Sequence, residues 1–244
     1  MFDYIVVGGG SAGSVLAGRL SEDPQVRVCL VEAGGPDSSV LIHCPAGLAV
    51  MAKTGANNWK LSTTPQPGLG GRRGYQPRGK TLGGSSSVNA MIYARGHASD
   101  YDHWAEQGNA GWGWSDVLPY FKRAENNERG ADDLHGTGGP LNVADLRSPN
   151  PLSHAFVQAG IQAGYAHNND FNGPEFEGVG LYQVTHRNGE RFSAAKAYLT
   201  PHLASRSNLH VVTGAQVTRV LMEGKRAVGV QYFKGGALHS ERAT

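Results

Sequence analysis

The first 34 residues alternate between apolar runs and a glycine-rich turn. Residues 3–7, DYIVV, are rich in β-branched residues, which is typical of a strand buried in a parallel sheet. Apolar residues then recur at helical spacing from Ser11 to Ser21, and a second apolar run, VRVCLVEAG, occupies residues 26–34. The pattern predicts a strand, a helix and a second strand, a βαβ unit of about 30 residues.

The middle of the chain shows helical periodicity only in places. Residues 34–100 contain frequent glycine and proline and no long periodic segment. Because a loop of that length is uncommon in a compact domain, we expect a large ligand to order it. Helices are predicted farther along, at 111–126 with Ser115 as N-cap, at 151–165, and at 193–204, where Pro201 stops or kinks the helix.

The end of the chain has the period of strands. Three strands are predicted at residues 208–214, 216–224 and 226–236, the last two joined by the tight turn EGKR. Together with the initial βαβ unit, these strands predict an α/β protein.

Composition and charge exclude several classes of protein. A chain of 244 residues with 39% hydrophobic residues can bury a sizeable core. A net charge of +2, with no Lys/Arg cluster that resembles a binding stripe, argues against nucleic-acid binding; the most basic stretch, GGRRGYQPRGK, is dominated by glycine and proline and is predicted to be a loop. Cys29 and Cys44 are too few for a disulfide framework or a four-cysteine metal site, which fits a reducing compartment. No apolar run approaches the roughly 20 residues of a membrane span, and no signal peptide is recognised. We therefore expect a cytoplasmic protein without a transmembrane segment.

The glycine-rich turn has the spacing of a dinucleotide-binding motif. Gly8, Gly10 and Gly13 form G-x-G-x-x-G between the predicted strand and helix, where glycines permit a tight turn, close approach to a pyrophosphate and close helix–strand packing. The backbone N–H groups from Ser11 onward can then bind phosphate. Glu32, at the end of the second strand, is placed to accept hydrogen bonds from an adenosine ribose. Both FAD and NAD fit this motif.

A second glycine-rich motif occupies residues 77–96, PRGKTLGGSSSVNAMIYARG. Its core, residues 83–86, offers backbone N–H groups and hydroxyls that suit a pyrophosphate or a flavin, and Asn89 can both donate to and accept from a flavin ring edge. The motif does not fit the nicotinamide site of an NAD-type enzyme. The alternative is a serine-capped glycine turn before a helix at residues 87–94.

These motifs resemble those of the glucose–methanol–choline (GMC) family of flavoprotein oxidoreductases. GKTLGGSSSVN, the amino-terminal GGGSAG and VEAGG carry the resemblance, and NNWKLSTTPQ and RNGERFSAAKAYLTP are similar to the choline and aliphatic alcohol dehydrogenase branch. The resemblance implies that FAD is the cofactor. It also implies an α/β fold with a Rossmann-like FAD-binding domain and a mixed α+β substrate domain that is only partly present. The expected FAD-binding domain covers residues 1–150 with a cofactor-wrapping loop at 34–100, the partial substrate domain covers 151–205, and strands at 206–244 return to the first domain.

The resemblance also implies which residues bind FAD. Matched position by position, they are Gly8, Gly10, Ser11, Ala12, Gly13, Glu32, Ala33, Gly79, Leu82, Gly83, Gly84, Ser85, Asn89, Ala90, Met91 and Val217. Trp59 matches a tryptophan of the family, with packing as the alternative role. Val88 stands where some choline-oxidising members have a histidine bonded to the flavin, so we expect non-covalent FAD.

The proton-accepting residue of the family does not match any position in this chain. In the family it is a histidine paired with a second histidine or asparagine near the carboxyl terminus, so the base is expected beyond residue 244, in a longer enzyme. His97 and His103 lie near the second motif without matching that position. Asp100, Asp102 and Glu106 fit a solvated helix start better than a catalytic pair, and no histidine pair has a third ligand nearby that would predict a metal site.

The expected reaction is the FAD-dependent oxidation of a primary alcohol, choline-like or aliphatic, to an aldehyde. The expected electron acceptor is a quinone or another carrier, and the full-length enzyme could associate peripherally with a membrane. An oxygen-using oxidase and a non-catalytic FAD-binding fragment or pseudoenzyme are alternatives, and a NAD-dependent enzyme is disfavoured by the second motif. The alcohol and the oligomeric state stay open.

Overall fold

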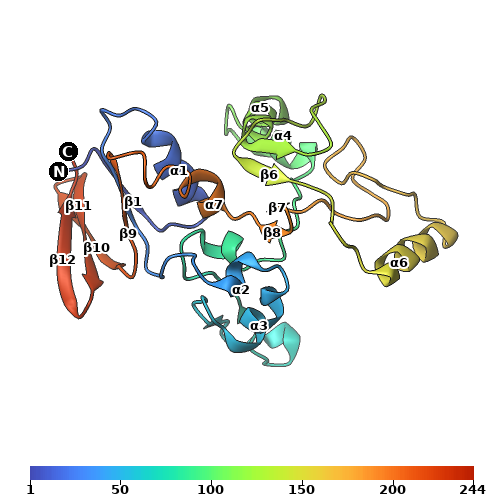
Figure 1. Cartoon of the computed structure of the whole chain (residues 1–244), viewed down its shortest axis with the longest axis horizontal. Helices are drawn as coiled ribbons and strands as arrows, with labels where there is room; N and C mark the ends of the chain where they lie inside the picture. Colours follow the sequence, from blue (N-terminus) through green and yellow to red (C-terminus); the bar gives the residue numbers. More distant parts are fainter. The chain divides into compact units, whose positions relative to one another are not determined.

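The computed structural model describes all 244 residues, which pack into two compact units. Unit 1 combines Met1–Ala90 with Glu190–Thr244, and unit 2 is Met91–Gly189 (Figure 1). The boundaries expected at residues 150 and 205 separate a cofactor-binding domain from a substrate domain by function. These functional boundaries stay a prediction. None of the helices is both long and apolar enough to cross a membrane.

Unit 1 is built on a three-stranded parallel sheet. The predicted βαβ unit is confirmed as β1 (Tyr4–Val7), α1 (Ser11–Leu20) and β2 (Val28–Val31). A third strand, β9 (Leu209–Val212), pairs in parallel with the other edge of β2, so that the strand order is β1-β2-β9. The central strand β2 is buried along its whole length, which explains its continuous apolar run.

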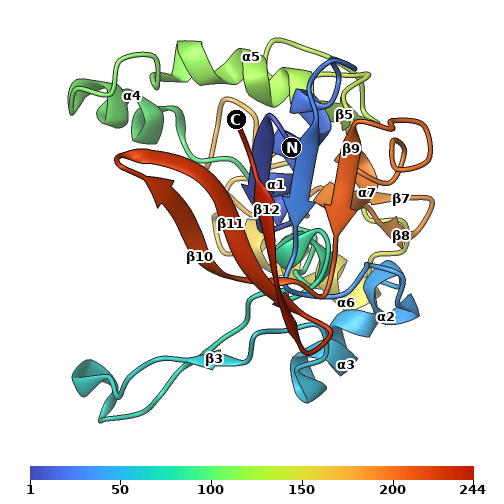
Figure 2. The same cartoon turned by 90° about the vertical axis from the view of Figure 1, so that its left-hand side faces the viewer.

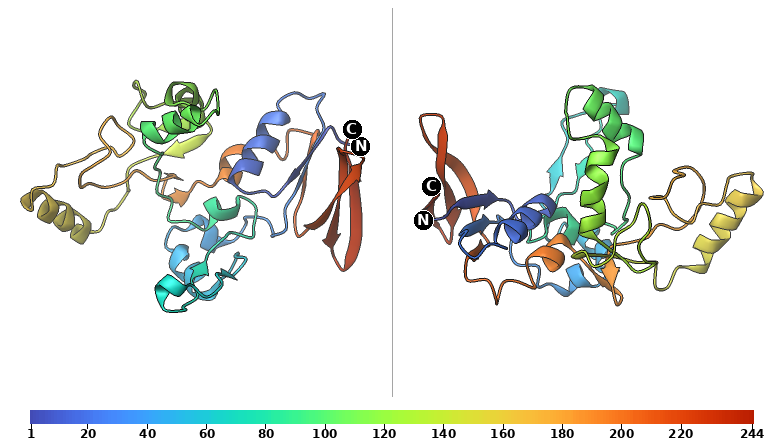
Figure 3. Two further views of the ribbon diagram at one scale, coloured as in Figure 1. Left: turned by 180° about the vertical axis from the view of Figure 1, so that it is seen from behind. Right: turned by 90° about the horizontal axis from the view of Figure 1, so that it is seen from above.

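The two faces of β2 contribute to different cores. Val28 and Leu30 belong to a buried cluster that includes residues of α1 and of α7 (Ala194–Tyr198). Cys29 and Val31 belong to a second cluster on the opposite face. The two helices lie side by side in both views of Figure 3 and cover the first face.

A three-stranded antiparallel sheet covers the second face. It consists of β10 (Gln216–Glu223), β11 (Arg226–Lys234) and β12 (Ala237–Arg242) (Figure 2). Val230 and Tyr232 of β11 pack against Cys29 and Val31. Burial raises the pKa of Cys29 to about 11, with a smaller contribution from the charge of Glu241, so its thiol is protonated at neutral pH. Strands β9, β10 and β11 were predicted, whereas β12 was not.

The segment between β2 and the second glycine motif contains more regular structure than its sequence pattern predicts. Its elements are α2 (Val40–His43), α3 (Gly47–Thr54), β3 (Leu61–Ser62), the 3₁₀ helix η1 (Pro67–Leu69) and β4 (Tyr75–Gln76). Hydrogen bonds within the protein hold its ends, because Lys80 N donates to Asn57 O at 2.8 Å and Leu82 N to Gly35 O at 2.9 Å. Protein contacts therefore contribute to the order of this segment, and its ordering by a large ligand stays a prediction.

Unit 2 contains three helices and short strands. The predicted helices are confirmed as α5 (Trp114–Ala124) and α6 (Pro151–Gln162). The acidic helix start is confirmed only for Asp100, in the first turn of α4 (Ala98–Glu106), because Glu106 is the last residue of that helix. Strands β5 (Glu125–Asn127) and β6 (Leu141–Val143) pair in parallel, and β7 (His186–Arg187) follows. The expectation that Ser115 caps α5 was wrong. Gly113, with an extended backbone (φ −65°, ψ 161°), is the N-cap, and its N–H donates to the Asp116 carboxylate at 3.2 Å.

A chain of buried charges lies inside unit 2. Arg95 Nη2 donates to Glu125 Oε2 at 2.8 Å, and His135 lies between two carboxylates, with Nδ1 3.0 Å from Glu125 Oε1 and Nε2 2.9 Å from Asp170 Oδ2. The hydrogen bond with Glu125 raises the pKa of His135 against the opposing effect of burial. Burial favours the neutral form of Glu125, but hydrogen bonds from His135 and the Gly136 N–H and the charge of Arg95 outweigh it and lower its pKa.

Candidate functional site

The first glycine motif forms a tight turn between β1 and α1. Gly8 has φ +93°, a left-handed conformation that favours glycine, and its N–H donates to Val31 O at 2.8 Å. A Cβ on Gly13 would lie 1.9 Å from Gly8 O, so only glycine lets the first turn of α1 pack this closely on the end of β1. Sequence reasoning assigned these two roles correctly, the turn to Gly8 and the packing to Gly13.

The outer side of the same turn is open. A Cβ on Gly8 would meet no atom within 4 Å, and one on Gly10 would meet only the Gly84 Cα at 3.9 Å. Gly10 is the N-cap of α1, and no side chain caps this end of the helix. Packing within the protein therefore does not explain the absence of a side chain at Gly10. The exposed backbone and the positive end of the helix form a surface suited to an anion.

Glu32 connects the turn to the end of β2. Its side chain is buried, and its two carboxylate oxygens accept hydrogen bonds from Gly9 N and from Gly34 N, both at 2.7 Å. The sequence predicts a ribose ligand here, whereas the structure adds a role in holding the turn. Each carboxylate oxygen has two lone pairs, so these bonds leave acceptor capacity for a hydroxyl.

The second glycine motif packs directly against the first. Leu82 is buried in the core shared by β2 and α1, and the motif continues through Gly83 into the 3₁₀ helix η2 (Gly84–Ser87). Gly83 N donates to Gly9 O at 2.7 Å, and a Cβ on Gly84 would lie 2.7 Å from the Gly10 Cα. The two motifs, which are far apart in the sequence, therefore form one continuous backbone surface.

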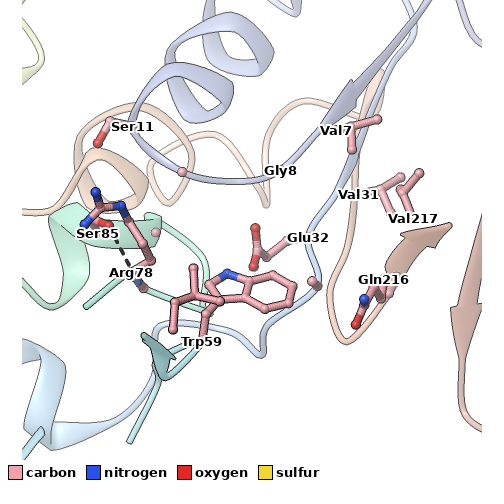
Figure 4. A pocket seen from close by; sticks show the side chains of 16 residues that line it. Val7, Gly8, Ser11, Val31, Glu32, Trp59, Arg78, Ser85, Gln216 and Val217 are labelled. Carbon is pink, nitrogen blue, oxygen red and sulfur yellow. Dashed lines mark hydrogen bonds between the residues drawn. The ribbon is translucent and has the colours of Figure 1, made fainter. Parts of the chain in front are cut away.

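A cleft of about 590 Å³ lies where the two motifs meet (Figure 4). It is lined by Val7, Gly8, Gly10, Ser11, Val31, Glu32, Ala33, Trp59, Leu61, Arg78, Gly79, Gly84, Ser85, Ala215, Gln216 and Val217. Its walls combine the carboxyl ends of β1 and β2, the amino end of α1, the start of η2 and the first residues of β10. The carboxyl ends of parallel strands are where ligands bind in open α/β sheets.

Nine of the predicted site residues line this cleft. They are Gly8, Gly10, Ser11, Glu32, Ala33, Gly79, Gly84, Ser85 and Val217. The other predicted residues do not line it. Ala12 and Gly13 lie in the first turn of α1, Leu82 belongs to the buried core, Gly83 is the N-cap of η2, and Asn89 and Ala90 follow η2. Met91 begins unit 2.

Some lining residues were not predicted as site residues. Arg78 lies in the second glycine motif and places a cation at the wall, and Leu61 and Ala215 add apolar surface to the lining. Trp59, weighed as a packing residue, borders the cleft near Glu32 in Figure 4, and the Lys80 ammonium lies 4.4 Å from the centre of its ring. The positions of Trp59, Leu61 and Arg78 at the cleft depend on how the segment after β2 folds, which a motif search does not predict.

The histidines near the second motif have structural partners in unit 2. His97 caps α4, where its Nδ1 accepts from Ser99 N at 3.3 Å, and His103 lies 3.6 Å from Glu106 on the same helix. No group of three or more histidine, cysteine or acidic side chains is arranged to hold a metal ion. The cleft itself contains no histidine.

Comparisons with known proteins agree with the geometry. A family model described as GMC oxidoreductase matches residues 2–244. The chain is 51% identical over 235 residues to an alcohol dehydrogenase [acceptor] of Pseudomonas putida, covering 96% of this chain and 42% of that protein. It is 48% identical over 250 residues to the mitochondrial choline dehydrogenase of Homo sapiens, covering 100% of this chain and 42% of that protein.

Solved structures share the fold. Pyridoxine 4-oxidase from Mesorbium loti matches with a TM-score of 0.93 and 38% identity, covering 100% of this chain and 48% of that one. An FAD-dependent oxidoreductase from Chaetomium thermophilum matches with a TM-score of 0.90 and 30% identity, covering 100% of this chain and 44% of that one. The chain thus spans less than half the length of the relatives that it matches.

Proposed function

Because the chain belongs to the GMC oxidoreductase family, we propose that it binds FAD in the cleft of unit 1 and serves the oxidation of a primary alcohol to an aldehyde. The observation that carries this proposal is the backbone contact between the two glycine motifs beside one cleft. This contact requires glycine at position 84, because a Cβ there would lie 2.7 Å from the Gly10 Cα.

The residues of the cleft fit the parts of FAD. The pyrophosphate would lie against the open backbone at Gly10 and the uncapped end of α1. Glu32 would accept a hydrogen bond from the adenosine ribose, and Val217 would contact adenine. The second motif would bind the flavin half of FAD, with Ser85 at the cleft and Asn89 toward the isoalloxazine ring. FAD bound here supplies a hydride acceptor for the carbon that carries the hydroxyl.

The chain's own residues hold the cofactor without a covalent bond in this proposal. Val88 has no nucleophilic atom, and it is buried against Ile42 and Met51. Hydrogen bonds and packing therefore account for all binding. Denaturation releases the flavin, whereas a covalent attachment would keep it on the protein.

The substrate class follows from the relatives. The Pseudomonas protein is named for alcohol and an acceptor, and a protein of Brucella anthropi that is 48% identical is named oxygen-dependent choline dehydrogenase. A small alcohol, aliphatic or choline-like, is the proposed substrate, and a quinone-type carrier or oxygen is the proposed acceptor. The proton acceptor is expected outside residues 1–244, as in the family pattern. The proposed location is the cytoplasm.

Turnover by the protein purified as its gene encodes it tests the proposal. Primary alcohols of increasing length and choline are supplied with an artificial electron acceptor under nitrogen, and separately with oxygen alone. Aldehyde formation coupled to acceptor reduction supports the dehydrogenase, and hydrogen peroxide formation at the same rate with oxygen identifies an oxidase. Bound FAD without turnover of any alcohol would favour a non-catalytic FAD-binding protein.

A further inference from the structure

Arg191 is a buried cation without a counter-ion in unit 1. It follows Glu190 in the short strand β8 (Glu190–Arg191), and its side chain is among the largest that are fully buried. Nε donates to Ile42 O at 2.9 Å, and Nη1 donates to Ser86 O at 3.2 Å and to Asn89 Oδ1 at 2.8 Å. All three acceptors are neutral, and Nη2 is buried without a partner.

Such an arrangement is costly for stability alone. A buried charge is normally paired with an opposite charge, and a buried donor without an acceptor adds a further penalty. Burial lowers the pKa of Arg191 to about 10, which still leaves the guanidinium charged at neutral pH. A neutral residue would fill the same space at a smaller cost, so the positive charge calls for a functional reason.

The contacts of Arg191 converge on the second glycine motif. The guanidinium binds Ser86 and Asn89, and the Ser86 hydroxyl accepts from Ala194 N at 2.9 Å, just beyond β8. A guanidinium only donates hydrogen bonds, so it fixes the Asn89 carboxamide with the oxygen toward the core. Asn89 itself is exposed, so its nitrogen end is held on the outer side.

We propose that Arg191 is a positioning residue for the flavin-binding segment, where its buried charge orients the Asn89 carboxamide as a hydrogen-bond donor toward the cofactor ring. This inference rests on the proposed binding of FAD. An amide can donate or accept hydrogen bonds, and this inference assigns Asn89 the role of donor. The contacts of Arg191 also brace the second glycine motif against strand β8, which comes about 100 residues later in the sequence. The charge also adds positive potential behind the segment, which favours the reduced flavin.

A double-mutant cycle tests the inference on the protein as its gene encodes it. The variants are Arg191→Met, Asn89→Ala and the double variant, with Arg226→Met, an exposed arginine of β11, as the control. The readouts are the FAD dissociation constant of refolded apoprotein, the midpoint potential of the bound flavin and the thermal unfolding of the apoprotein. We expect Arg191→Met to weaken FAD binding by about tenfold to hundredfold, as for the loss of a charged hydrogen bond.

The coupling of FAD affinities in the double-mutant cycle and the flavin midpoint potential distinguish a positioning role of Arg191 from a role in stabilising the fold alone. If Arg191 acts through Asn89, the double variant binds FAD no more weakly than the weaker single variant, and Arg191→Met shifts the midpoint potential to more negative values. Additive losses, or a lower melting temperature with FAD affinity and potential unchanged, would overturn the inference. If Arg191→Met does not fold, Arg191→Lys replaces it in the same cycle. Failure of the unaltered protein to bind FAD would instead refute the proposed function and the inference with it.

Discussion

At the residue scale, the cleft depends on polar and small residues that have more than one task. Glu32 was predicted as a ribose ligand, and the structure shows that its carboxylate also holds the backbone at Gly9 and Gly34. Gly8 and Gly10 leave the outer side of the turn open, whereas Gly13 is required by packing. A methyl group would therefore face the open cleft at Gly10 but would disturb the packing of α1 on β1 at Gly13. FAD affinity and unfolding free energy measure these two effects separately.

Replacing Glu32 with glutamine removes one of its two acceptor oxygens. The amide nitrogen would then face a backbone N–H and leave it without an acceptor, so we expect the free energy of unfolding to fall by about 1–3 kcal/mol. Urea unfolding of the apoprotein measures the change, with Glu177→Gln, an exposed glutamate, as the control. An unfolding curve that matches the unaltered protein would show that the two short bonds do not stabilise the turn.

Alanine at Gly10 should mainly weaken FAD binding, whereas alanine at Gly13 should mainly lower the stability of the fold. A methyl group on Gly10 faces open space, so we expect its unfolding free energy to change by less than about 1 kcal/mol while FAD binding weakens by about tenfold or more. A methyl group on Gly13 collides with Gly8 O, so we expect a loss of stability of about 1–3 kcal/mol or more. Urea unfolding and FAD titration of both variants provide the comparison. Equal FAD affinity for Gly10→Ala and the unaltered protein would contradict the assigned pyrophosphate contact.

At the scale of elements, the sequence predicts those with a strong local signal. Strands β1 and β2 are continuous apolar runs within the parallel sheet, and α5 and α6 carry recognisable apolar positions. In contrast, β12 is exposed along most of its length, so its pairing with β11 leaves no alternating pattern to detect. Helix α3 begins at a glycine and buries only two residues, which gives no apolar stripe.

The buried ion network of unit 2 predicts how stability depends on pH. The lowered pKa of Glu125 gives stability that is lost as the pH falls below the ordinary glutamate value of about 4.3. The raised pKa of His135 gives stability that is complete below about 6.5 and is lost as the pH rises through the pKa of the folded state. These two groups therefore favour a stability maximum between those values.

The variant His135→Gln isolates the alkaline side of this dependence. Without the imidazolium between Glu125 and Asp170, the decline in stability above about pH 6.5 should disappear. Tryptophan fluorescence during urea unfolding at a series of pH values follows mainly unit 2, which contains three of the four tryptophans, Trp104, Trp112 and Trp114. His103→Gln, on the exposed surface of α4, is the matched control. An unchanged alkaline decline in His135→Gln would assign that decline to other groups.

At the scale of the whole molecule, the cleft is formed by segments that are distant in sequence and adjacent in the fold. The predicted positions in both glycine motifs meet at one cleft, because Gly83 donates to Gly9 and Gly84 packs on Gly10. Sequence reasoning could identify each motif from its spacing. It could not place Arg78 at the cleft or Arg191 behind Asn89, because these contacts arise from the chain path after β2 and from strand β8. Long-range packing of this kind leaves no periodic trace in the sequence.

Titration of the apoprotein with FAD shows whether the two glycine motifs form one FAD site. Isothermal titration with FAD and, separately, with NAD⁺ is carried out on the protein as its gene encodes it, together with its Gly84→Ala variant and the control Gly35→Ala, where a Cβ would meet no atom within 4 Å. The account predicts saturable binding of one FAD per chain, no comparable binding of NAD⁺, a marked loss in Gly84→Ala and none in Gly35→Ala, with acid precipitation releasing the flavin. Tight binding of NAD⁺ without FAD, or FAD binding that Gly84→Ala leaves intact, would contradict it.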